Sequence, residues 1–78
     1  MTLHSSAEQQ RKMMEALRTG PITTLEAAND LDIVHPPSTV RCLRNKGHII
    51  VTAWTYQATD AGRRPHRVAK YVLLQEAS

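Results

Sequence analysis

The chain has 78 residues, 41% hydrophobic and 22% charged, with a formal net charge of +3 and a pI near 9.5. This length predicts one domain spanning residues 1–78, with a simple core between residues 6 and 74. A single cysteine excludes an internal disulfide, and no apolar run approaches the roughly 20 residues that span a bilayer. We therefore expect a cytoplasmic protein without membrane contact.

The charge is distributed unevenly along the chain. Residues 1–32 carry three basic and five acidic side chains, whereas residues 33–78 carry seven basic and two acidic ones. A basic half joined to a mildly acidic half predicts one surface that faces a polyanion. The alternative is a general solubilising charge.

The first helix is expected to begin in the Ser5-Ser6 pair, where a capping box fits, and to end at Gly20-Pro21. Apolar residues at helical spacing form its inner stripe, and we place them in the core: Ala7, Met13, Met14 and Leu17.

A short extended segment at residues 21–23 is allowed before the second helix, for which Thr24 is the expected N-cap. That helix ends near Leu31. Its inner face is expected to carry Leu25, Ala28 and Leu31.

The third helix is expected over residues 37–46. Pro37 disfavours helical geometry at Pro36, so Pro36 is placed outside the helix and Pro37 at its first position, with Ser38 as a competing cap. Val40 and Leu43 point inward, and Gly47 ends the helix.

Strand-forming residues dominate the rest of the chain. Two strands are expected, near residues 49–56 and 67–74, joined by a long turn. Trp54 and Tyr56 alternate on one strand, share a face, and are expected to pack on the first helix rather than stack on nucleic-acid bases.

Two short helices joined by a turn suit DNA recognition, because the first braces the second in a major groove about 12 Å wide. On the third helix, Ser38, Thr39 and Arg41 are the candidates for base edges, with Asn45 on the same outer side. Its far end is expected to hold phosphate through Arg44 and Lys46. The alternative is a solvated helix face.

The turn between the strands is strongly basic. Arg63, Arg64, His66 and Arg67 lie within five positions without an acidic neighbour among them. Such a cluster can reach backbone phosphates or a minor groove. A solubilising loop tip is the alternative.

Other chemistries lack support in the sequence. The four histidines are far apart, and Cys42 has no orienting partner and is expected to pack at a helix flank. We expect no metal site, no catalytic residues, no cofactor and no enzymatic activity.

The runs PITTLEAANDLDI, TVRCLRNKGHIIVT and RVAKYVLL resemble small winged helix-turn-helix proteins of phages and prophages. The resemblance covers about residues 21–74 and is most specific at residues 43–50. It departs from the family pattern at residues 32–34, where a Gly-Ile-Ser/Thr turn is usual, and at Pro36-Pro37. It implies an α+β fold of three helices followed by a two-stranded β-hairpin wing, and DNA binding.

The leading hypothesis is therefore a sequence-specific, nucleoid-associated transcriptional regulator that binds double-stranded DNA. One alternative is an excisionase-like factor that bends DNA, and another is a protein-interaction module that docks an acidic partner on its arginines. A homodimer is left open, with the Met13 and Met14 side of the first helix as the candidate contact.

Overall fold

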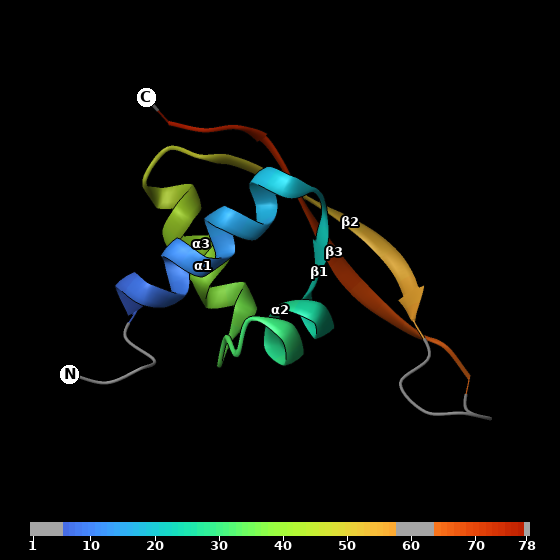
Figure 1. Cartoon of the computed structure of the whole chain (residues 1–78). Coiled ribbons are helices and arrows are strands. Elements are labelled where there is room, and N and C mark those ends of the chain that lie inside the picture. Colours follow the sequence, from blue (N-terminus) through green and yellow to red (C-terminus); the bar gives the residue numbers. More distant parts are fainter. Residues whose placement is uncertain (1–5, 58–63, 78) are drawn as a thin grey trace.

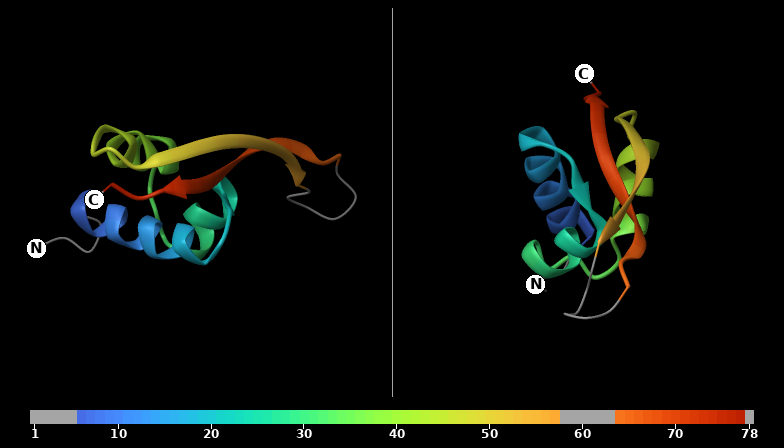
Figure 2. Two further views of the ribbon diagram at one scale, coloured as in Figure 1. Left: turned by 90° about the horizontal axis from the view of Figure 1, so that it is seen from above. Right: turned by 90° about the vertical axis from the view of Figure 1, so that its right-hand side faces the viewer.

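The computed structural model describes residues 6–57 and 64–77. Three helices come first, and a long two-stranded hairpin extends past them (Figures 1 and 2). In the described ranges, no helix combines the length and apolar character that crossing a bilayer requires. The elements in chain order are α1 (Ser6–Thr19), β1 (Ile22–Thr23), α2 (Thr24–Asp30), α3 (Pro36–Asn45), β2 (Ile49–Gln57) and β3 (His66–Gln75).

The three expected helices are confirmed, but the expected two-stranded sheet is wrong. The two residues of β1 pair antiparallel with β3, Ile22 opposite Tyr71 and Thr23 opposite Lys70, which gives a three-stranded sheet in the order β1-β3-β2. Two residues are too few to show the alternation that marks a strand in sequence. Burial of Ile22 against the core and pairing with β3 together stabilise this short strand.

The core lies between the helices and one face of the sheet. Met13, Met14 and Leu17 of α1 are buried, as expected, whereas Ala7, expected on the same stripe, is exposed. The Met13 and Met14 side therefore cannot supply an exposed dimer contact. In α2 the buried residue is Ala27, whereas Ala28, expected inside, is exposed. The remaining members of the core are Ile22, Ile33, Val40, Leu43, Ile50 and Tyr71.

The second helix begins one residue earlier than expected. Thr23, not Thr24, is the N-cap: its hydroxyl accepts from the amide of Glu26 at 3.1 Å, and the Glu26 carboxylate accepts from the Thr23 amide at 2.9 Å. This reciprocal capping box satisfies two amides that a helix start leaves unpaired.

A tight turn joins α2 to α3. Asp32 has a φ of 55°, in the left-handed region, and the next amide, of Ile33, donates to the Ala27 carbonyl at 3.1 Å. Aspartate tolerates this conformation better than most side chains, so it can stand where the resembled family uses glycine.

The start of α3 also differs from expectation, because Pro36 lies inside the helix. His35 is the N-cap, with Pro36 and Pro37 in the first turn, and its ring Nδ1 accepts from the Ser38 amide at 3.3 Å. The restriction that Pro36 places on its predecessor falls on His35, whose φ of −140° lies outside the helical region, whereas Pro36 itself is helical despite the following Pro37. Neither proline needs a hydrogen-bond partner for an amide there.

The end of α3 is fixed by the expected glycine. Gly47 has a φ of 103°, its amide donates to the Arg44 carbonyl at 3.0 Å, and the His48 amide donates to the Leu43 carbonyl at 3.3 Å. This pair of bonds is a Schellman motif, which satisfies the last carbonyls of the helix and turns the chain into β2. Both ends of α3 are therefore held in place.

Candidate nucleic-acid interface

The outer face of α3 carries a polar stripe. Ser38, Arg41 and Asn45 are spaced three and four residues apart, so they lie on one side of the helix, and all three are exposed. The Ser38 hydroxyl lies 2.6 Å from His35 Nδ1. Within the described ranges, the side chains of Arg41 and Asn45 make no hydrogen bond or ion pair. Their polar groups are therefore available to a ligand.

Thr39 does not belong to this outer face, and its expected exposure is wrong. Only 7% of the residue is accessible, and its hydroxyl lies 3.5 Å from the His35 carbonyl. Thr39 lies three residues after Pro36 and four before Leu43, so residues 36, 39, 40 and 43 form the inner stripe. Cys42, expected at a flank, is half-buried and has a free thiol.

Arg44 has an intramolecular role. Its Nε donates to the Ile50 carbonyl at 2.8 Å, and its terminal nitrogen donates to the Thr52 hydroxyl at 2.9 Å. These bonds join the last turn of α3 to strand β2. Lys46 is the exposed C-cap of the same helix and remains a candidate for phosphate contact.

The first turn of α3, residues 36–38, offers no free amide to an anion. Two of its three residues are prolines, and the third amide, of Ser38, already donates to His35. A helix N-terminus binds phosphate through such amides. A phosphate at this turn would therefore depend on side chains.

The hairpin carries the second group of basic residues. Arg64, His66 and Arg67 are exposed at its outer end, while Arg63 lies outside the described residues. The guanidinium carbon of Arg67 stands 4.2 Å from the centre of the Trp54 ring, a cation–π contact.

The Trp54 and Tyr56 side chains were expected to pack on α1, and that expectation is wrong. Trp54 is 57% exposed and Tyr56 is 71% exposed. The strand continues beyond the point where the helices cover it (Figure 2). The residues opposite them on β3 are Ala69 and Arg67, a small side chain and a cation, and this register is visible only in the structure.

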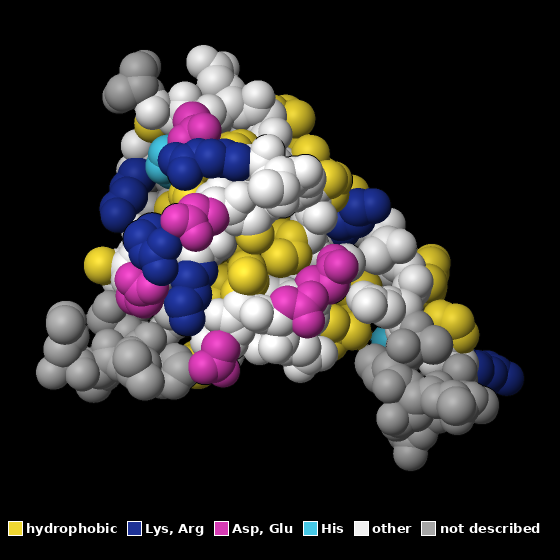
Figure 3. Space-filling model, viewed as in Figure 1, with side chains coloured by type: hydrophobic (Ala, Val, Ile, Leu, Met, Phe, Trp, Pro, Cys, Tyr) yellow, Lys and Arg dark blue, Asp and Glu magenta, His cyan; other side chains and the backbone are white. Residues whose placement is uncertain are grey.

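The cations of α1 are engaged by acidic or carbonyl oxygens. Arg11 is ion-paired with Glu8 and, at 2.7 Å, with Glu15, while Arg18 reaches Glu76 at 2.7 Å. Hydrogen bonds from these guanidinium groups lower the pKa of both Glu8 and Glu76. Figure 3 shows basic and acidic side chains interleaved on this side of the molecule. The side of α1 is therefore electrostatically mixed, unlike α3 and the hairpin.

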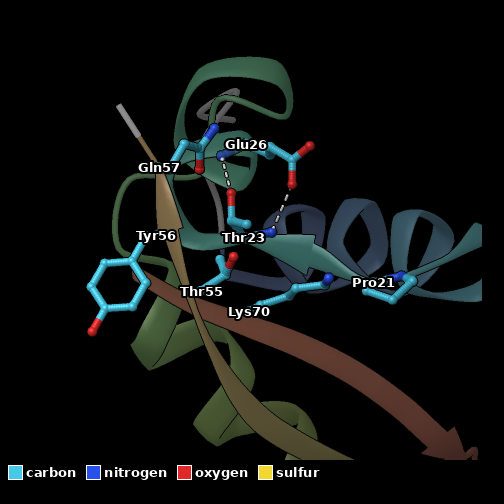
Figure 4. Close-up of a pocket in the computed structure, with 7 residues that line it drawn as sticks. All are labelled: Pro21, Thr23, Glu26, Thr55, Tyr56, Gln57 and Lys70. Atoms are coloured by element: carbon cyan, nitrogen blue, oxygen red, sulfur yellow. Dashed lines mark hydrogen bonds between the residues drawn. The ribbon is translucent and has the colours of Figure 1, made fainter. Parts of the chain in front are cut away.

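A pocket of about 340 Å³ lies where α2 begins beside the hairpin (Figure 4). The carboxylate of Glu26 in its wall is held by the Thr23 amide. Elsewhere in the described ranges, no three His, Cys, Asp or Glu side chains gather as a metal site would require. The lining residues are Pro21, Thr23, Glu26, Thr55, Tyr56, Gln57 and Lys70.

A comparison with protein families gives one result. A family model described as "Winged helix-turn-helix domain" matches residues 8–76, which is most of the chain. No curated protein and no solved structure matches significantly.

Proposed function

The chain belongs to the winged helix-turn-helix family, and from this membership we propose that it binds double-stranded DNA sequence-specifically as a transcriptional regulator. The observation that carries the proposal is the outer stripe of α3. Ser38, Arg41 and Asn45 stand exposed on a helix whose two ends are fixed by a cap and a Schellman motif. Such rigidity positions side chains for base recognition at little entropic cost.

In this proposal α3 lies in the major groove. Arg41 makes paired hydrogen bonds to a guanine edge, while Asn45 and Ser38 contact base or phosphate. Lys46 holds phosphate at the far end of the helix. Thr39 is not part of the proposed surface, because its side chain is buried.

The outer end of the hairpin provides the second contact. Arg64, His66 and Arg67, with Arg63 beside them in sequence, lie on DNA backbone or in a minor groove. The unpaired cations of α3 and of the hairpin would thus face the same polyanion, while those of α1 are neutralised locally.

The salt dependence of binding tests this proposal. Fluorescence anisotropy of a labelled duplex is measured at 50 and 200 mM salt. Six to ten phosphate contacts weaken binding by about 10³–10⁵ over that interval. Binding that is absent, or insensitive to salt, contradicts the proposal.

Selection of bound duplexes from a random pool tests sequence specificity. A defined site supports a regulator, and a palindromic one indicates a homodimer. A featureless pool contradicts specific recognition. The double variant Arg64→Ala/Arg67→Ala is expected to reduce affinity for every duplex by a similar factor. Unchanged affinity would favour a protein-interaction module.

A further inference from the structure

Two of the three aromatic residues in this chain face solvent. Trp54 and Tyr56 are 57% and 71% exposed, whereas Tyr71 is 4% exposed in the core. Exposed apolar side chains that gather on one face commonly mark a binding site. Alternate residues of a strand share a face, so the two side chains lie on the same side of β2, with their Cα atoms about 7 Å apart.

This face of the hairpin is continuous with α3. Thr52 precedes Trp54 on the same face, and its hydroxyl accepts from Arg44 of α3 at 2.9 Å. Figure 4 shows Tyr56 directed away from Thr55 and Gln57, toward the other side of β2. A ligand that runs along α3 therefore meets the aromatic face next.

The Trp54 ring is oriented by its neighbours on β3. Ala69 stands opposite it in the register and leaves space beside the indole, while Arg67 stands opposite Tyr56. From there the Arg67 guanidinium reaches diagonally over the ring, 4.2 Å from its centre. A cation over one face restricts the indole and leaves the rest of the ring accessible.

The charge around the rings indicates which class of ligand can bind there. The described hairpin residues, 49–57 and 64–75, include Arg64, His66 and Arg67 at the outer end and no acidic side chain, while Lys70, opposite Ala53, lies on the other face. Flat apolar rings beside unpaired cations match a ligand that combines flat bases with an anionic backbone. Unpaired nucleotides have this combination, and proteins that bind single strands use aromatic rings and basic grooves together.

We propose that Trp54 and Tyr56, with Arg67, form a stacking platform for unpaired nucleobases that adjoin the duplex bound by α3. This inference rests on the proposed function. From Thr52 to Tyr56 the strand spans about 13 Å, close to four base-pair rises. The platform therefore engages bases within a few nucleotides of the duplex contact, as at a fork or an overhang.

The single tryptophan of the chain reports directly on this platform. Trp54 emission and affinity are measured with three ligands: a blunt duplex, the same duplex with a six-thymidine single-stranded arm, and the thymidine strand alone. The armed duplex is expected to bind about tenfold more tightly than the blunt one and to quench the emission.

Three variants change the rings, and a fourth serves as the control. Trp54→Ala loses the preference for the armed duplex and keeps the affinity for the blunt one, while Trp54→Phe retains part of the preference. Val51→Ala, which shortens an exposed side chain on the other face of β2, is the matched control and leaves the preference intact. Tyr56→Ala reduces the preference with Trp54 still present as the probe.

The outcomes separate this inference from the proposed function. Equal affinity for blunt and armed duplexes with unchanged emission overturns the platform and leaves duplex binding standing. Quenching by the thymidine strand with no binding of any blunt duplex supports the platform and contradicts the proposed function. Emission that shifts with protein concentration alone shows that a second copy covers the rings, and overturns the platform.

Discussion

Arg41 and Arg44 stand three positions apart on α3, yet their surroundings differ. The Arg44 side chain donates to the Ile50 carbonyl and the Thr52 hydroxyl, whereas Arg41 meets no such partner in the described ranges. Both residues were expected to contact DNA. The sequence shows two arginines on a basic helix. Only the position of β2 shows that Arg44 connects α3 to the sheet and that Arg41 remains available to a ligand.

Substituting each arginine by alanine separates the two roles. Arg41→Ala is expected to leave the free energy of unfolding within about 0.5 kcal/mol of the wild type. It should weaken binding to the selected duplex by about 1–3 kcal/mol. Arg44→Ala is expected to lower the free energy of unfolding by about 1–2 kcal/mol, because two hydrogen bonds are lost. Urea titration and anisotropy on both variants check this, and an Arg44→Ala protein of wild-type stability would contradict it.

Burial of Tyr71 makes the free energy of unfolding decrease at alkaline pH. Burial raises its pKa above the ordinary value of 10.0. The folded chain therefore retains a proton that the unfolded chain begins to release near that pH, and stability falls as the pH rises further. Below pH 10 this contribution is fully present.

Tyr71→Phe is expected to flatten this alkaline loss. The urea midpoint is measured at pH 8 and pH 10.5 for the wild type, for Tyr71→Phe and for Tyr56→Phe. The exposed Tyr56 is the matched control, and its variant should lose stability with pH as the wild type does. If Tyr71→Phe loses as much as the other two, burial of Tyr71 is not the cause.

At the scale of elements, helices were the easiest to predict. The spacing of Met13, Leu17, Val40 and Leu43 located α1 and α3 and their inner faces, because helical periodicity is a long-range signal. Cap assignment depends on single residues and is therefore harder to predict. Both α2 and α3 begin one residue earlier than expected. The most specific match to the family pattern, residues 43–50, turned out to be largely structural: it holds Arg44, the Schellman glycine and the first residues of β2.

The turn between α2 and α3 is a point where one substitution tests backbone strain. Asp32→Gly removes the Cβ penalty at φ 55° together with the interactions of the Asp32 side chain, and its free energy of unfolding serves as the reference. Asp32→Val places a β-branched residue in the left-handed region and should lower it by about 1–2 kcal/mol. Thermal unfolding of both variants gives the comparison, and equal midpoints would mean that the turn tolerates any side chain.

Across the whole molecule, the hairpin is the part least determined by sequence. Its strands were predictable from composition, but which face the helices cover depends on how far the helices reach along it. The three strands overlap only in two rows, one of Ile22, Tyr71 and Thr52 and one of Thr23, Lys70 and Ala53. Farther out, at Tyr56 and Arg67, only β2 and β3 remain paired.

Hydrogen exchange should reveal this division. Amides of β3 near Tyr71 are expected to exchange only on global unfolding, since a strand flanks them on each side and the core lies beneath. Amides near residues 56 and 67 should exchange at least about tenfold faster through local opening of the hairpin. Exchange measured by NMR at pH 7 resolves both groups, and uniform protection along β3 would contradict the division.

The sheet order β1-β3-β2 leaves the nine-residue strand β2 with a neighbour on one side only. Natural proteins usually guard such an edge with lysine, proline or a bulge, but residues 50–57 contain no charge and no proline, and the one irregularity falls at Ile49. Repulsion between the arginines of neighbouring molecules then becomes the main barrier to edge-to-edge pairing. Concentrated protein in high salt, where that repulsion is screened, should self-associate through β2.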